Sequence, residues 1–427
     1  MSAVPSFIQS AFDGGEPGEG RHLPGLCGMV ERWILDTSEY PNPSLAKCAA
    51  LSFVGKLCDR KVAGPVSNNV TLLFLIAIAL TGIGKQKPLQ APKVLLGALG
   101  GEHADMLGAG DFQSVQGIEA LVTLKPNSLN VVDEFGTVLS RLMAEGNTHS
   151  NSITSQLNPI WGNGWIVLPM SVRAHSKELT PVIAPMPAIF GASTPMEFYE
   201  ALGKNAVGGG FINRLLCFQA GPKPLFTEPT ADPLDPPAAL MRGIREVVRW
   251  IGPEEKPQGA VLHPAKRLSW GPGAFDLWRA LVNLMAVFDG LSPSEVDLRQ
   301  RVAEQALRVA TVIAAGRMSA TVDRADIMWG TQIAEASLAF VQDGLEKYGP
   351  SLDDRRVVCN EIEEFTRARG FVSDRDVYRK WRRRQRFGNN LVDSALDTLE
   401  KQGLIKKGEH KPWNGGPASR GWLWVGC

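Results

Sequence analysis

The most apolar segment of the chain, from Val70 to Ile83, limits what the protein can fold into. It contains two threonines and a glycine, and it is shorter than the roughly 18 to 20 residues of a membrane-spanning helix. We therefore expect a buried strand and no membrane partner. Further apolar runs at 129–132 and 188–192, separated by helical stretches, predict an α/β domain with a mostly parallel sheet.

Changes in composition divide the 427 residues into regions, since the chain is too long for one ordinary core. A dense run of prolines between Pro222 and Pro237 cannot continue a helix or a central strand, and it predicts a linker. Residues 1–24 are expected to be a poorly ordered arm, and helical spacing predicts two helices between 26 and 62. The expected regions are an N-terminal arm with helices (1–65), an α/β core (66–230), a helical lid (238–345) and a C-terminal module (351–427).

Overall composition excludes several classes of protein. The chain is 44% hydrophobic and 21% charged, as in soluble globular proteins. Its six cysteines form no C-x-x-C pair, so neither a zinc site nor a disulfide framework is expected. The N-terminus lacks the features of a secretory signal, and we expect a cytoplasmic protein. Because the net charge is only +1, any contact with DNA must come from local clusters of Lys and Arg.

A glycine-containing turn, Ala79-Leu-Thr-Gly-Ile-Gly-Lys85, follows the first apolar run. In such a turn backbone N–H groups can wrap a phosphate while the lysine reaches the β- and γ-phosphates. Gly82 and Gly84 supply the backbone freedom. By itself the turn could be an ordinary connection between a strand and a helix. The residues predicted to bind the nucleotide are Thr81, Gly82, Ile83, Gly84, Lys85 and Gln86.

An adjacent pair of carboxylates ends the second apolar run, Leu129-Asn-Val-Val-Asp-Glu134. Asp133 is predicted to hold Mg²⁺ directly or through water, and Glu134 to polarise the attacking water. Alone, the pair could be a solvated helix start. Because the two motifs occur in this order, each after an apolar strand, they predict a P-loop site for ATP and Mg²⁺.

Two departures from the usual P-loop pattern affect this site. Gln86 stands where a Ser or Thr hydroxyl normally meets Mg²⁺, and Ala79 stands where the first glycine is usual. Pro88 and Pro92 fall where a helix should follow the turn. A proline in the first turn is tolerated, but Pro92 predicts a short or kinked helix.

Two later segments offer further catalytic candidates. Ser193 and Thr194 end the third apolar run, where a polar residue could sense the γ-phosphate, although a helix N-cap before Pro195 is an equal alternative. Arg214 follows a glycine-rich turn and could reach the γ-phosphate of a neighbouring subunit as an arginine finger. By itself, such an arginine is more often a surface residue.

The order TGIGK, NVVDEFG, FGASTP and GGGFINRLL resembles a large family of phage, prophage and plasmid proteins. These proteins have a RecA-like or AAA+ helicase core and are often encoded with or fused to primases. The resemblance covers roughly residues 45–340, and it implies ATP binding, ring assembly and DNA as the track. The family's lysine, acidic pair and post-core arginine correspond to Lys85, to Asp133 with Glu134, and to Arg214.

The helical region resembles the lid of AAA+ helicases, in which an arginine can sense the γ-phosphate. Arg299 or Arg301 could do so. The alternative is helical pairing of Arg301 with Glu304 or Gln305.

The C-terminal module has the order of elements of a winged helix. Helices are expected at 357–369, at 374–384 after a Ser373 cap, and at 391–402 up to Gly403, with strands at 404–407 and 421–425. Its basic residues cluster as phosphate binding requires, and Asn389, Asn390 and Ser394 could approach base edges. The alternative is a protein-binding winged helix. The predicted DNA-binding residues are Arg379, Lys380, Arg382, Arg383, Arg384, Arg386, Asn389 and Asn390.

The sequence thus predicts an α/β P-loop ATPase core, RecA-like or AAA+, with a helical lid and a winged-helix domain. We expect a DNA helicase or replication ATPase of a phage, satellite or other mobile element, with ATP and Mg²⁺ as cofactors. It is expected to form a homo-oligomer, a hexamer, with single-stranded DNA in the ring and duplex at the winged helix. One alternative is a replication initiator or scaffold that binds ATP but scarcely hydrolyses it. Another is a helicase loader that engages a host replication protein through its winged helix. A primase or a host replication protein is also an expected partner.

Overall fold

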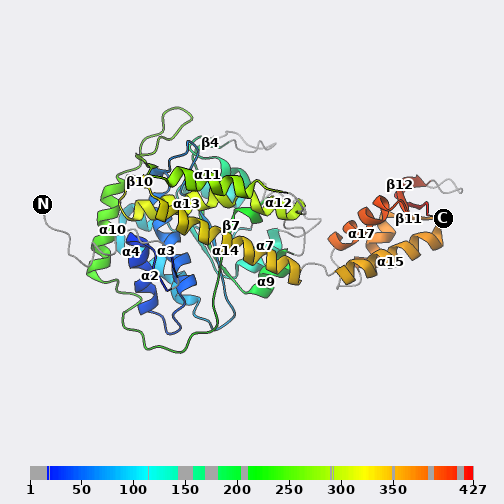
Figure 1. Cartoon of the computed structure of the whole chain (residues 1–427), viewed down its shortest axis with the longest axis horizontal. Helices are drawn as coiled ribbons and strands as arrows, with labels where there is room; N and C mark the ends of the chain where they lie inside the picture. The colour runs from blue at the N-terminus through cyan, green and yellow to red at the C-terminus, as the bar shows by residue number, and fades with distance from the viewer. Residues whose placement is uncertain are drawn as a thin grey trace.

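The computed structural model describes most of the chain and shows two parts, each with its own hydrophobic core (Figure 1). One core runs from Leu23 to Val341, and the other from Val358 to Trp422. The expected N-terminal arm lies mostly outside the described residues. The structure describes residues 17–18, 20–113, 115–142, 157–168, 181–202, 210–288, 291, 293–348, 352–382, 389–410 and 418–426.

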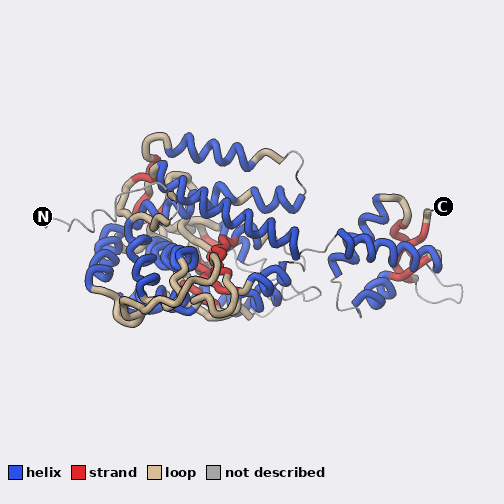
Figure 2. Tube along the Cα trace, turned by 60° about the horizontal axis from the view of Figure 1, so that its bottom comes forward, coloured by secondary structure: helices blue, strands red, loops and turns tan. Residues whose placement is uncertain are grey.

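A four-stranded parallel sheet, enclosed by helices, forms the centre of the larger part (Figure 2). The strands lie in the order β3-β6-β2-β7. All residues of the two inner strands, β2 and β6, are buried. Burial on both faces explains their unbroken apolar sequences and confirms the predicted parallel sheet. The bounds are Phe74–Ile78 for β2, Leu129–Val132 for β3, Ala188–Ser193 for β6 and Leu215–Gln219 for β7.

The two helices predicted before the sheet are confirmed as α2 (Gly25–Asp36) and α3 (Pro43–Cys58). The side chain of Asn42 caps α3 by accepting a hydrogen bond of 3.3 Å from the backbone N–H of Leu45. Pro43 fits the first helical position, where its missing N–H has no intrahelical partner. Helix α3 is buried along most of its length and packs against the sheet.

The helices expected as a lid share the core of the sheet. Every residue of α13 except Glu304 is buried, and α13 packs against both α3 and α14. A parallel pairing of the short strands β1 (Val62–Ala63) and β8 (Lys266–Arg267) adds a further link to the N-terminal region. The helices of this region are α10 (Ala238–Ile251), α11 (Ala274–Met285), α12 (Pro293–Arg299), α13 (Val302–Gly316) and α14 (Arg324–Tyr348).

Two expectations about local structure meet different outcomes. The proline-rich residues 222–237 contain neither helix nor strand, as predicted. Helix α4 (Gln86–Leu99), which follows the glycine turn, is 14 residues long, so of the two alternatives expected at Pro92 the short helix is wrong and the kink stays a prediction. Pro88 lies in its first turn and Pro92 is buried within it, so packing of the helix against α3 outweighs the lost hydrogen bond.

The C-terminal part combines three helices with a three-stranded antiparallel sheet of order β11-β13-β12. The three predicted helices and two predicted strands are confirmed, with ends shifted by a few residues. Strand β11 was not predicted. The bounds are α15 Leu352–Arg369, β11 Phe371–Ser373, α16 Asp374–Arg382, α17 Asn389–Lys401, β12 Ile405–His410 and β13 Ser419–Trp424. In the described part of the chain, no helix has the length and apolar character that crossing a membrane requires.

Candidate functional site

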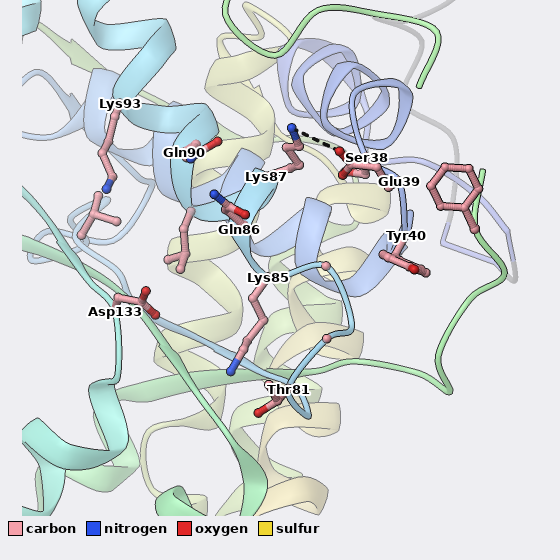
Figure 3. A pocket seen from close by; sticks show the side chains of 15 residues that line it. Ser38, Glu39, Tyr40, Thr81, Lys85, Gln86, Lys87, Gln90, Lys93 and Asp133 are labelled. Atoms are coloured by element: carbon pink, nitrogen blue, oxygen red, sulfur yellow. Dashed lines mark ion pairs between the residues drawn. The ribbon is translucent and has the colours of Figure 1, made fainter. Parts of the chain in front are cut away.

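A cavity of about 700 Å³ lies at the carboxyl edge of the parallel sheet (Figure 3). The loop after β2, the first turns of α4 and the end of β3 line it, together with residues 38–40 and Phe226. Ligands of parallel α/β sheets bind at this edge, because the connecting loops there can form a crevice. The cavity therefore lies where the sequence predicted the nucleotide.

The glycine turn is held in a conformation that requires glycine. Gly82 and Gly84 have φ angles of +80° and +81°. A Cβ atom on Gly84 would lie 2.6 Å from the carbonyl oxygen of Tyr40, which is closer than such atoms approach. The turn leads directly into α4, whose first N–H groups have no partner within the helix and favour an anion.

The charges in the cavity are unevenly compensated. Lys87 forms an ion pair of 3.6 Å with Glu39. Among the described residues, Lys85 and Lys93 have no ion-pair partner. Figure 3 shows Lys85 and Asp133 on either side of the same space. Three lysines against two carboxylates leave an excess of positive charge, which attracts an anionic ligand.

Asp133 and Glu134 differ in their relation to the cavity. Asp133 lines it, whereas Glu134 does not, although both side chains are exposed. Glu134 has a φ angle of +56°, and its N–H donates a hydrogen bond of 3.0 Å to Oδ1 of Asp133. A left-handed conformation is uncommon for a residue other than glycine and is often found at functional sites. Glu134 also directly precedes helix α7 (Phe135–Leu142), as the alternative of a helix start required.

The predicted nucleotide-binding residues lie together at one end of this space. Thr81, Gly82, Gly84, Lys85 and Gln86 line the cavity. Ile83 is buried in the core beneath the turn and does not line it. Gln86 carries an amide, and no hydroxyl, at its place in the cavity lining.

Thr194 has the role of a helix cap. Its Oγ1 accepts a hydrogen bond of 3.3 Å from the N–H of Glu197, and Glu197 Oε2 accepts one of 3.4 Å from the N–H of Thr194. This reciprocal capping box begins helix α9 (Pro195–Leu202). Ser193 is buried beside Gly136, just after the acidic pair, and neither residue lines the cavity.

No model of a known protein family matches this sequence, and no curated protein is significantly similar to it.

Arg214 lies at the opposite end of the sheet from the cavity. It immediately precedes β7, whose first residue pairs with Phe74 at the start of β2. Its guanidinium carbon is 5.5 Å from the ring centroid of Trp161, and it donates a hydrogen bond of 3.2 Å to Asn213 Oδ1. Burial, together with the nearby charges of Arg301 and Arg308, lowers the pKa of Arg214 to about 10, against the opposing effect of the Glu304 carboxylate. Within its own chain Arg214 does not face the cavity, and a role toward a neighbouring subunit stays a prediction.

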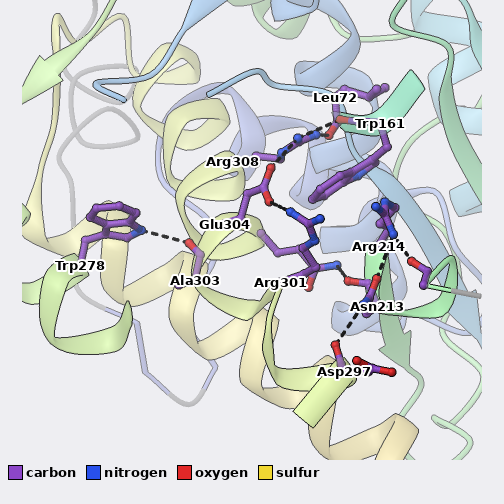
Figure 4. A network of polar contacts seen from close by, with 12 residues as sticks. Leu72, Trp161, Asn213, Arg214, Trp278, Asp297, Arg301, Ala303, Glu304 and Arg308 are labelled. Atoms are coloured by element: carbon purple, nitrogen blue, oxygen red, sulfur yellow. Dashed lines mark hydrogen bonds and ion pairs between the residues drawn. The ribbon is translucent and has the colours of Figure 1, made fainter. Parts of the chain in front are cut away.

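The two arginines expected from the lid also have partners in their own chain. Arg301 Nη1 lies 2.8 Å from Glu304 Oε2, which confirms the alternative of helical pairing (Figure 4). Arg299 donates a hydrogen bond of 3.3 Å to the carbonyl oxygen of Val287. Neither arginine lines the cavity.

The predicted DNA-binding residues concentrate on α16 and the start of α17. Arg379 and Lys380 are exposed, and the Lys380 ammonium lies 3.8 Å from the ring centroid of Phe365. The predicted Ser373 cap is confirmed, because its Oγ accepts a hydrogen bond of 3.2 Å from the N–H of Asp376. Arg382, Asn389 and Asn390 lie at the ends of these helices, whereas Arg383, Arg384 and Arg386 lie outside the described residues.

Sequence reasoning missed one side of the cavity. Ser38, Glu39 and Tyr40 come from the loop after α2, and Phe226 comes from the proline-rich segment. Neither segment carries a ligand-binding motif. The available signal was an aromatic residue within a run of prolines.

Proposed function

We propose that this chain is an ATP-dependent, ring-forming DNA helicase or replication ATPase of a mobile element. The observation that carries the proposal is the position of Lys85, without an ion-pair partner among the described residues, across the cavity from Asp133 at the carboxyl edge of the sheet. A lysine at a glycine turn and a carboxylate after a neighbouring strand form a suitable arrangement for a nucleoside triphosphate with Mg²⁺.

Each residue has a role in this proposal. The N–H groups at the start of α4 and the Lys85 ammonium bind the phosphates, as the excess positive charge favours. Asp133, the Thr81 hydroxyl and the Gln86 amide oxygen line the cavity and offer the oxygen ligands that Mg²⁺ takes. When bound, Mg²⁺ neutralises charge on the phosphates. Glu134 polarises the water that attacks the γ-phosphate and releases ADP.

Two features support DNA as the second partner. The C-terminal part has the helix and strand order of a winged helix, with exposed basic residues on α16. The motif order resembles ring helicases of mobile elements. On this basis the protein acts as a homo-oligomer, a hexamer, with single-stranded DNA in the ring and duplex at the C-terminal part. A primase or a host replication protein is a further proposed partner.

ATP hydrolysis with and without single-stranded DNA tests the proposal. We expect turnover that DNA stimulates, and a loss of about 100-fold in Lys85→Ala and Glu134→Gln, as is typical when a charged catalytic group is removed. Lys256→Ala is the matched control, because Lys256 is exposed and lies outside the cavity. Unchanged turnover in Lys85→Ala would contradict the proposal.

A second function is favoured by Gln86 and Glu134. Gln86 supplies no hydroxyl, and Glu134 does not line the cavity. These observations fit an initiator or scaffold that binds ATP to order its ring but scarcely hydrolyses it. In that case the unmodified protein binds ATP without turnover, and Glu134→Gln leaves ATP binding and DNA binding unchanged.

A further inference from the structure

The proline-rich segment is fixed across one side of the cavity. The N–H of Thr227 donates a hydrogen bond of 2.9 Å to the carbonyl oxygen of Glu39, and that of Thr230 donates one of 2.8 Å to the carbonyl oxygen of Asp36. Both acceptors belong to the end of α2 and the loop after it. Pro224 and Pro229 on either side of Phe226 restrict the backbone further, so the position of Phe226 is well defined.

Phe226 places an exposed aromatic ring at the rim of a cationic cavity. Its relative exposure is 66%, although a large apolar side chain gains by burial. The ring packs edge-on against Tyr40, with centroids 6.0 Å apart and planes at 76°. The Lys223 ammonium lies 4.8 Å from the Tyr40 centroid. Tyr40 is therefore held by two neighbours, while Phe226 keeps an exposed surface.

This aromatic pair adjoins the glycine turn. The backbone of Tyr40 is so close to Gly84 that no Cβ fits between them. One cavity thus combines lysines that suit phosphate with an aromatic ring that suits a flat π-system. A nucleotide is a ligand that carries both groups, and a cavity of about 700 Å³ falls within the range of small-molecule sites.

We infer that Phe226, supported by Tyr40, forms the base-binding end of the cavity and stacks on the base of the bound nucleoside triphosphate. The inference rests on the proposed function, since it assumes that the phosphates lie at Lys85. Stacking on an aromatic ring tolerates any base, because every base has a π-face.

Binding of two probes separates the base from the phosphates. Isothermal titration of the full chain in Mg²⁺ would measure the affinity for ATP and for inorganic tripolyphosphate, which has no base. We expect Phe226→Ala to weaken ATP binding roughly tenfold, within the range found for loss of base stacking, and to leave tripolyphosphate binding unchanged. Phe226→Trp should restore the affinity for ATP, because it restores an aromatic face.

Two controls separate this inference from the proposed function. Leu225→Ala removes a neighbouring side chain with 88% exposure that does not line the cavity, and it should bind ATP like the unmodified protein. Lys85→Ala should weaken both probes. If Lys85→Ala weakens ATP binding but Phe226→Ala does not, the stacking inference is wrong and the nucleotide site stands. Equal losses of both probes in Phe226→Ala would also overturn stacking, and unchanged binding of both probes in Lys85→Ala would overturn the nucleotide site.

Discussion

Gly82 and Gly84 share a backbone conformation but have different surroundings. Both φ angles lie in the left-handed region, where a residue with a Cβ costs roughly 1–2 kcal/mol. Apart from its two chain neighbours, no described residue has an atom within 4 Å of a Cβ on Gly82, whereas a Cβ on Gly84 would collide with the Tyr40 carbonyl. The close approach of Tyr40 therefore adds a second reason for glycine at position 84.

This difference predicts the effects of two alanine variants. Gly82→Ala carries only the backbone cost, about 1–2 kcal/mol. Gly84→Ala carries that cost and also displaces Tyr40, so its loss of unfolding free energy should be at least twice as large. Urea denaturation of both variants measures the losses. Gly82→Ala is the control, because it carries only the cost of the φ angle. If both variants lost the same unfolding free energy, Tyr40 would move away from position 84 at no cost, and the prediction would be wrong.

At the scale of residues, the sequence predicted the side chains of the cavity that belong to recognisable motifs. Lys85 and Asp133 line one cavity because each follows a strand of the same parallel sheet. Tyr40 and Phe226 could not be predicted, since hydrogen bonds between distant segments bring them together. Arg308 is a similar case. Its guanidinium is buried and donates hydrogen bonds of 2.9 Å to the carbonyl oxygens of Leu72 and Trp161, which no helical pattern indicates.

Two variants at the start of helix α9 test whether Thr194 acts as a helix cap or as a sensor of the γ-phosphate. Its Oγ1 bonds the N–H of Glu197 in the capping box. Thr194→Ala should lower the unfolding free energy by about 1 kcal/mol, the usual cost of losing a cap. Thr194→Ser should keep the cap and the stability. A fall in ATP turnover of 100-fold with unchanged thermal stability would instead show a sensor role.

Helix ends were predictable where a single local interaction, such as a side-chain cap, determines them. The start of α16 was predicted from Ser373, whose side chain caps the helix. The start of α3 follows the same rule, because the Asn42 side chain caps it. A short α4, one of the two alternatives expected at Pro92, is wrong because tertiary packing holds Pro92 within the helix. Strand β11 is only three residues long, and its pairing with β13 depends on residues some fifty positions later.

At the scale of the molecule, the described chain has two hydrophobic cores. They do not follow the boundaries of the four regions expected from the sequence. The helices expected as a lid contribute to the same core as the sheet. Helical periodicity shows that a helix has an apolar face, but it does not show which surface that face covers. The C-terminal part has a core of its own, built around Val358, Ile362 and Trp422.

This separate core predicts what removal of residues 349–427 will do. The remaining chain keeps its whole core, so its thermal unfolding temperature and its ATP binding should stay unchanged. Its affinity for duplex DNA should fall, because the exposed arginines of α16 that would neutralise phosphates are gone. Fluorescence anisotropy with labelled duplex measures the affinity. An unfolded truncated protein would show that the two cores depend on each other.

Salt dependence then shows whether α16 contacts phosphates. Arg375 and Arg379 are exposed one helical turn apart on α16. Each phosphate that they neutralise releases counterions, so Arg375→Gln with Arg379→Gln should reduce the slope of log affinity against log salt by about 2. Glu364→Gln, an exposed change on α15, is the control for a general change in charge. Binding to DNA phosphates depends strongly on salt, because it releases counterions. If the full chain binds duplex only weakly and its affinity does not vary with salt, the C-terminal part has a protein partner instead.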